Sequence, residues 1–166
     1  MSRTDVVAEA LVRRMDHYFN NPDQTPVGGL TGGCQLRPGM GLPPLDAFGE
    51  CSLPWVMSGV RGLSEHFPTL DASADCRGRL TVEFSVGVAR CSVALGEDGS
   101  LPSLETMEAE YARQEDDKDR LWAATCTAMK ELQDEFKIRD AALGQIDVHG
   151  PQGGTVAVYR TIMVAL

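Results

Sequence analysis

Several features that mark common classes of protein are scarce in this chain of 166 residues. No apolar run approaches the ~20 residues that a membrane-spanning helix needs, so we expect no membrane partner. The first residues include the charged Arg3 and Asp5, which predicts that the N-terminus is not a secretory signal. Aromatic residues make up only 6% of the chain, which leaves few large side chains as anchors. These scarcities favour a folded protein that works inside the cell.

Positively charged residues are also few: the chain has 15 lysines and arginines against 24 acidic residues, for a net charge of −9. Proteins that bind nucleic acid gather positive charge to replace the counterions of the phosphates, and this chain does the reverse. Solubility alone explains such acidity. It is also compatible with DNA that passes nearby without sticking.

Clustered metal ligands and catalytic motifs are missing as well. The chain has five cysteines: Cys34, Cys51, Cys76, Cys91 and Cys126. Because their number is odd and no two have Cys-x-x-Cys spacing, we predict reduced, mostly buried thiols. The three histidines are too far apart in sequence to suggest a zinc site. The acids at 115–119 would point in different directions on a helix, so we expect a solvated helix face there rather than a metal site. No glycine-rich stretch has the context of a phosphate-binding or dinucleotide-binding loop. We therefore predict no catalytic, cofactor-binding or metal-binding residues.

Regular elements are expected at both ends and in the middle of the chain. Val7, Leu11, Met15 and Tyr18 recur at helical spacing, with Ser2 and Asp5 as a cap and residues 20–22 as a stop. A strand is expected over 53–63. Strict alternation from Leu80 to Val88 predicts a half-buried strand that continues to Val93.

The second half predicts a long helix and a closing strand. Pro102 and Ser103 open the helix, whose buried stripe we expect at Leu121, Thr125, Ala128, Leu132 and Phe136. After a turn at 150–154, residues 155–166 read as a terminal strand or hairpin, with Arg160 interrupting its apolar face.

Glycine and proline crowd residues 22–49, where we expect no regular element. A stretch of this length without structure is unusual in a compact domain and is either disordered or ordered by a partner. Its apolar residues leave two alternatives open: it covers the domain's own core, or it docks on another subunit.

Together these elements predict one α+β domain over residues 1–166. It has an antiparallel or mixed β-sheet with an N-terminal helix and one long helix packed on one face, plus a long Gly/Pro-rich loop or arm at 22–49.

Three segments resemble a neck protein of long-tailed phages that infect actinobacteria. They are residues 43–51 (PPLDAFGEC) with 53–56 (LPWV), residues 76–91 (CRGRLTVEFSVGVARC) and residues 150–154 (GPQGG). The element order is similar to that of the tail terminators, which have an N-terminal helix, strands, a helix on the sheet and a closing strand. The resemblance covers roughly residues 43–166.

This resemblance implies a virion structural protein rather than an enzyme. Tail terminators form a hexameric ring that caps the tail tube and joins it to the head connector, so the implied partners are further copies of the chain, the major tail tube protein and the connector or stopper. Genomic DNA would pass through the acidic lumen without sequence-specific binding. The resemblance also implies that the protein assembles in the host cytoplasm and is located in the neck of the virion. The segment 22–49 would be a docking arm, and the expected interface residues are Leu36, Met40, Leu42, Phe48 and Trp55.

Two other functions remain open. A different neck protein, the head-tail stopper or the head completion protein, predicts a more barrel-like or helical fold. A small cytosolic enzyme that uses a cysteine, such as Cys51, Cys76 or Cys91 with His66 and Asp71, predicts one hyper-reactive thiol.

Overall fold

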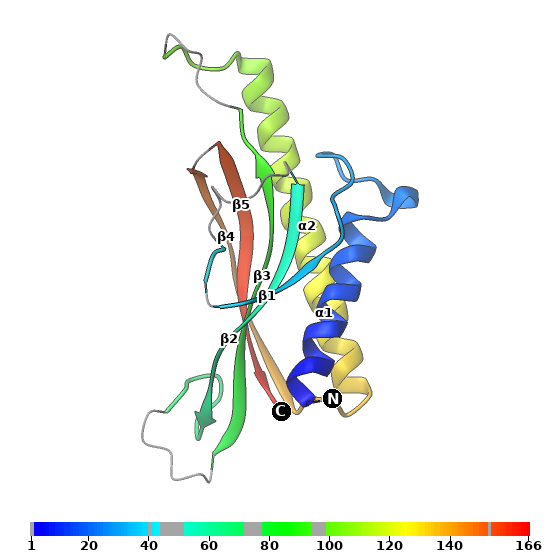
Figure 1. Cartoon of the computed structure of the whole chain (residues 1–166), viewed down its shortest axis with the longest axis vertical. Helices are drawn as coiled ribbons and strands as arrows, with labels where there is room; N and C mark the ends of the chain where they lie inside the picture. Colours follow the sequence, from blue (N-terminus) through cyan, green and yellow to red (C-terminus); the bar gives the residue numbers. More distant parts are fainter. Residues whose placement is uncertain (1, 40, 44–51, 72–77, 94–98, 153) are drawn as a thin grey trace.

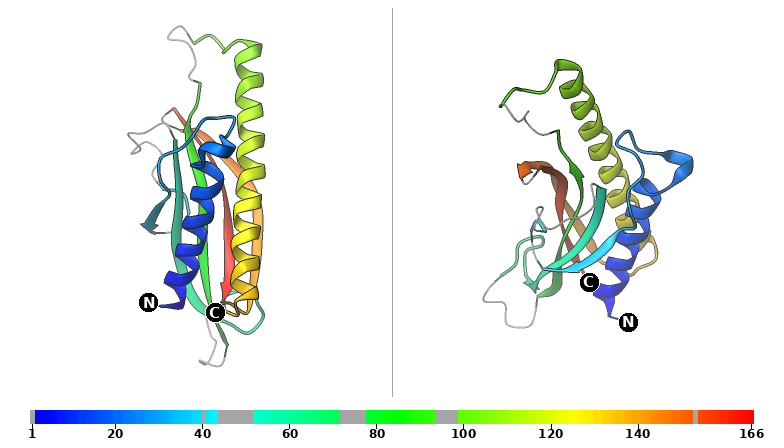
Figure 2. Two further views of the ribbon diagram at one scale, coloured as in Figure 1. Left: turned by 90° about the vertical axis from the view of Figure 1, so that its right-hand side faces the viewer. Right: turned by 45° about the horizontal axis from the view of Figure 1, so that its top comes forward.

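The computed structural model of the chain describes residues 2–39, 41–43, 52–71, 78–93, 99–152 and 154–166. Within these residues, two long helices lie side by side on one face of a five-stranded mixed sheet (Figure 1, Figure 2). The elements in chain order are α1 (Arg3–Phe19), the short 3-10 helix η1 (Pro22–Gln24), β1 (Gln35–Pro38), β2 (Ser52–Ser64), β3 (Arg79–Cys91), α2 (Leu104–Asp134), β4 (Asp140–Gln152) and β5 (Thr155–Ala165). This arrangement confirms the predicted α+β class with both helices on one face.

α1 begins and ends where the sequence predicts. The Asp5 backbone N–H donates to Ser2 Oγ at 3.2 Å, and the Ser2 N–H donates back to Asp5 Oδ2 at 2.8 Å, which completes a capping box. This backbone hydrogen bond, with that of the Ser2 hydroxyl, lowers the pKa of the Asp5 carboxyl. The buried face carries Val7, Leu11 and Met15 as expected, but Phe19 is buried more fully than Tyr18.

The sheet has the strand order β1-β2-β3-β5-β4, which puts β3 in the centre. β1 pairs with β2 in parallel, and all other neighbours are antiparallel. β3 was predicted to have one buried face, but from Val82 to Arg90 it is buried on nearly every residue. The helices cover one face of the sheet, and a small buried cluster lies on the other face; its members are Trp55, Met57, Ala89 and Ala157.

α2 confirms the predicted start and most of the predicted stripe. Ser103 Oγ accepts from the Thr106 N–H at 3.2 Å and caps the helix. Four stripe residues are buried; they are Leu121, Thr125, Ala128 and Leu132. The prediction that Phe136 is the fifth buried residue of the stripe is wrong, because Phe136 follows the end of the helix with φ 55° and is 93% exposed. The first half of α2 extends beyond the end of the sheet (Figure 1).

β5 confirms the terminal strand, and Arg160 on it is buried rather than exposed. Arg160 Nε donates to the Gly144 carbonyl oxygen of β4 at 3.0 Å, and Nη1 donates to Thr125 Oγ1 of α2 at 3.1 Å. Burial lowers the pKa of this guanidinium below its ordinary value. A charged side chain therefore fits the apolar face because protein oxygens replace water around it.

The glycine-rich and proline-rich segment does contain regular structure, so the prediction that it has none is wrong. η1 lies at its start, and β1 pairs with β2 from Gln35 opposite Trp55 to Pro38 opposite Ser58. Local sequence gives no sign of β1, because its hydrogen bonds go to a strand outside the segment. Residues 40 and 44–51 lie outside the described residues.

Candidate interaction surfaces

The five predicted interface residues divide into three groups. Leu36 lies on the edge strand β1 and is 55% exposed, as an interface residue should be. Leu42 is half-buried and packs against the cluster around Trp55. Met40 and Phe48 lie outside the described residues.

Trp55 is 0% exposed, so the prediction that it lies at a docking surface is wrong. Its indole lies over Gly87 of β3, where an added Cβ would come within 2.6 Å of Trp55 Cζ2. Tyr159 of β5 flanks the same position from the other side. Trp55 is therefore a core residue of the sheet face opposite the helices, and Gly87 leaves the space that it fills.

A buried arginine holds part of the 22–39 segment against the domain. Arg90 of β3 donates from Nε and Nη2 to the two carboxylate oxygens of Asp117 on α2, at 2.7 and 2.8 Å. Its Nη1 donates to the carbonyl oxygens of Gly28 and Gly29 and to Ser52 Oγ, at 2.9, 3.2 and 2.8 Å. One side chain thus joins β3, α2, the segment and the start of β2.

The Asp117 carboxylate corrects the prediction that the acids at 115–119 form a solvated face. Asp117 is buried, whereas Asp119 is exposed. Burial raises the pKa of the Asp117 carboxyl, and the hydrogen bonds and charge of Arg90 act against that rise. The charge pattern could not show this pair, because its partner is on a strand far away in sequence.

A second arginine holds the neighbouring part of the segment. Arg120 of α2 donates from Nη1 to the carbonyl oxygens of Tyr18 and Gln24, at 2.9 and 2.8 Å. Its Nε pairs with Asp116 at 2.8 Å, and that carboxylate also accepts the backbone N–H of Val27 at 2.8 Å. The described part of the segment therefore lies on its own domain, and the bonds from α2 and β3 fix its path.

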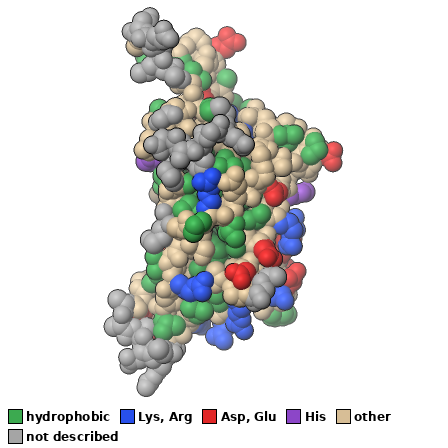
Figure 3. Space-filling model, viewed as in Figure 1, with side chains coloured by type: hydrophobic (Ala, Val, Ile, Leu, Met, Phe, Trp, Pro, Cys, Tyr) green, Lys and Arg blue, Asp and Glu red, His purple; other side chains and the backbone are tan. Residues whose placement is uncertain are grey.

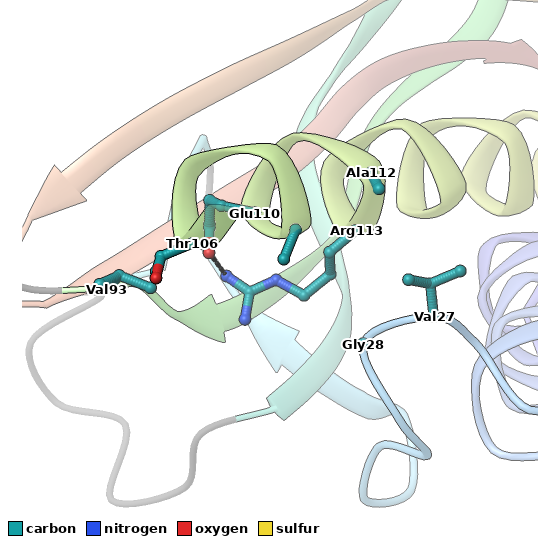
Figure 4. Close-up of a pocket in the computed structure, with 8 residues that line it drawn as sticks. Val27, Gly28, Val93, Thr106, Glu110, Ala112 and Arg113 are labelled. Atoms are coloured by element: carbon teal, nitrogen blue, oxygen red, sulfur yellow. Dashed lines mark hydrogen bonds and ion pairs between the residues drawn. The ribbon is translucent and has the colours of Figure 1, made fainter. Parts of the chain in front are cut away.

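A hollow of about 390 Å³ opens between this segment and the projecting half of α2 (Figure 4). Val27 and Gly28 line one side, and Thr106, Glu110 and Arg113 of α2 line the other. Figure 4 shows the Arg113 guanidinium beside Glu110 on the α2 side of the hollow, where the two side chains form an ion pair. Because its charges are already matched, the hollow offers no obvious place for a charged ligand.

Exposed apolar residues follow one side of α2. Leu104, Met107 and Tyr111 are spaced by three and four residues, so they share a face. They are 68%, 45% and 65% exposed, and Trp122, three turns further on, is 55% exposed. We refer to these four residues as the outer flank of α2. The spacing of Leu104, Met107 and Tyr111 is a sequence pattern that predicts an apolar helix face, although acidic residues lie between them.

Reactive chemistry is not apparent in the part of the chain that is described. Cys34 is half-buried, and its burial, together with the charge of Asp16, raises the pKa of its thiol well above the ordinary value. Cys126 is also a free thiol. Cys91 is disulfide-bonded, so the prediction of reduced thiols is wrong there. Cys51 and Cys76 lie outside the described residues.

The described residues show neither a metal-binding cluster nor a membrane-spanning helix. They contain no group of three or more His, Cys, Asp or Glu side chains placed to hold a metal ion. None of their helices is long and apolar enough to cross a membrane.

Comparison with known proteins adds no relative: no protein-family model matches the chain, and no curated protein matches it significantly.

Proposed function

We propose that the protein is a structural component of a phage neck, a tail terminator whose copies form a ring that caps the tail tube and joins it to the head connector. The observation that carries this proposal is the outer flank of α2, four large apolar side chains exposed on a helix whose first half extends beyond the sheet (Figure 1). A group of apolar side chains exposed to water is costly unless another surface covers it.

The fold supports the terminator over the other neck proteins. An N-terminal helix, strands, a helix on the sheet and a closing strand match the element order that the resemblance implies. The open sheet with both helices on one face is neither barrel-like nor mainly helical. The net charge of −9 suits a channel through which DNA slides.

The enzyme alternative draws less support. That alternative names Cys51, Cys76 or Cys91 as the nucleophile, and Cys51 and Cys76 lie outside the described residues. Cys91 is held in a disulfide.

Light scattering tests the proposal on the purified protein, alone and mixed with tail tubes built from the major tail protein. We expect a mass of several subunits, hexameric when complete, and co-elution with the tubes. A monomer that ignores the tubes and binds the head connector would replace this proposal with the stopper or completion protein.

A further inference from the structure

We propose that Cys91 forms its disulfide with Cys51, and that this bond is a redox-sensitive cross-link at the base of the 22–39 segment. Reducing it loosens part of the segment without unfolding the domain. Cys51 itself lies outside the described residues, but its peptide bond to Ser52, which is described, limits where it can be. The cross-link goes beyond the proposed function and does not depend on it.

Two cysteines are available as the partner of Cys91. Cys91 is disulfide-bonded, whereas Cys34 and Cys126 are free thiols. Of the five cysteines in the chain, this leaves Cys51 and Cys76.

Chain length excludes Cys76. β3 begins at Arg79 and ends at Cys91, and its 13 residues span about 40 Å as an extended strand. Cys76 precedes Arg79 by three residues, which reach at most about 11 Å. The α-carbons of Cys76 and Cys91 are therefore more than about 20 Å apart, and a disulfide needs them within about 7 Å.

The strand register brings Cys51 within reach. Ser52, the first residue of β2, lies opposite Arg90 near the end of β3 (Figure 1). Because the two strands are antiparallel, the residue before Ser52 and the residue after Arg90 are the next pair in register. Such opposed residues have α-carbons about 4.5–5.5 Å apart, which is a distance that a disulfide spans. Cys51 is the residue before Ser52, and Cys91 follows Arg90.

This cross-link joins the immediate neighbours of two residues that hold the segment. Arg90 Nη1 donates to the carbonyl oxygens of Gly28 and Gly29 at 2.9 and 3.2 Å, and to Ser52 Oγ at 2.8 Å. The Ser52 carbonyl oxygen accepts the backbone N–H of Gly32 at 3.4 Å. These bonds act on the segment together only while Ser52 stays beside Arg90, and the cross-link fixes that separation.

The segment depends on such backbone bonds because its own large apolar side chains point outward. Val27, Leu30 and Leu36 are 64%, 43% and 55% exposed. Arginine and lysine side chains lie at the surface of the face drawn in Figure 3, but Arg90 is only 3% exposed, so its bonds to the segment are shielded from water. Arg120 of α2 holds the earlier part of the segment separately, and we therefore expect reduction to loosen residues 28–32.

The cross-link forms and breaks by thiol–disulfide exchange. On closing, the thiols of Cys51 and Cys91 lose two protons and two electrons to a small disulfide such as oxidised glutathione, which becomes two thiols. On opening, a thiolate of the reductant attacks one sulfur and the other leaves as a thiolate; a second reductant thiol then resolves the mixed disulfide. A reducing compartment keeps both cysteines as thiols, and an oxidising one closes the bond.

Counting thiols tests the assignment, with Cys51→Ser as the test variant and Cys76→Ser as its matched control. Each protein is oxidised with glutathione disulfide, unfolded in guanidinium chloride without reductant and labelled with iodoacetamide, and its intact mass is measured. We expect three labels on the wild type, four on Cys51→Ser and two on Cys76→Ser. In a tryptic digest of the labelled wild type, peptide 91–113 should be joined to peptide 15–61 and not to 62–77. Peptide 91–113 joined to 62–77, or five labels on the wild type, would overturn the assignment.

Hydrogen–deuterium exchange, read by mass spectrometry, tests what the cross-link does. After reduction with a phosphine, the amides of residues 28–32 should exchange at least threefold faster, while those of α2 from Leu121 to Leu132 keep their rate. Unreduced Cys51→Ser should behave like the reduced wild type, and unreduced Cys76→Ser like the oxidised one. Circular dichroism checks that each sample stays folded. Equal exchange of residues 28–32 in both redox states, or unfolding of the whole domain on reduction, would show that the bond is no switch for the segment.

Discussion

Arg90 and Asp117 form a buried ion pair with two hydrogen bonds, of 2.7 and 2.8 Å, that joins the central strand to the long helix. Both side chains are almost completely excluded from water, at 3% and 2% exposure. The third nitrogen of Arg90 holds the backbone of Gly28 and Gly29. The pair therefore supports the base of the projecting part of α2 and the path of the segment beside it.

Replacing Asp117 with asparagine should destabilise the protein by about 3–5 kcal/mol, because it leaves the Arg90 charge buried without its partner. Urea unfolding followed by circular dichroism measures the change. Asp119→Asn is the control on the same helix, exposed to water and expected to change stability by less than about 0.5 kcal/mol. Equal effects of the two substitutions would mean that the pair contributes nothing.

Gly87→Ala should destabilise the protein by about 1–3 kcal/mol through overpacking. The new methyl group would lie 2.6 Å from both Trp55 Cζ2 and Tyr159 Cβ, so the indole must move. Thermal unfolding measures the loss, and Gly33→Ala is the control, since no atom lies within 4 Å of its added Cβ. A Gly87 variant as stable as the Gly33 variant would contradict the placement of Trp55.

Phe136 has a left-handed backbone, with φ 55°, just after α2 ends. Glycine adopts this conformation without the clash that a Cβ causes, so Phe136→Gly should be more stable than Phe136→Ala by about 1 kcal/mol. Alanine is the right comparison because it removes the ring and keeps the Cβ. Chemical denaturation of both variants gives the difference, and alanine as stable as glycine would argue against the strained backbone.

The Cys34 thiol should react slowly with iodoacetamide in the native state and rapidly after unfolding. Burial raises the pKa of this thiol above its value in the unfolded chain, so little thiolate forms at pH 8. The same shift predicts that stability is unaffected below the unfolded pKa and falls as the pH rises above it, because only the unfolded chain then ionises freely.

Peptide mass spectrometry after timed labelling measures this reactivity, and Cys34→Ala should remove the alkaline loss of stability. A thiol in the native protein that reacts faster than in the unfolded chain would instead favour the enzyme alternative.

Much of the fold follows from local patterns. The Ser2–Asp5 box, the alternation in β3 and the start of α2 at Ser103 each depend on residues a few positions apart, and all three are found where they are predicted. β1 was missed because its four residues pair in parallel with a strand about twenty residues away, which no local pattern reveals.

The candidate site was harder to predict than the fold. Leu36 was predicted at an interface because it is an apolar residue in a glycine-rich segment, and the structure shows that its side chain is exposed. Trp55 was misplaced because the space that receives it is made by Gly87, on another strand. Asp117 looks in sequence like its neighbours Asp116, which is half-buried, and Asp119, which is exposed, and only the approach of Arg90 distinguishes it. In each case the deciding partner is distant in sequence.

The most direct measurement is negative-stain microscopy of tail tubes mixed with the protein. The account predicts a ring of subunits at one end of each tube, seen with the wild type and lost with Leu104→Ser combined with Tyr111→Ser. The control variant Leu80→Ser, which changes a 41% exposed leucine at the start of β3, should keep the ring. Tubes whose two ends stay bare at saturating wild-type protein would contradict it.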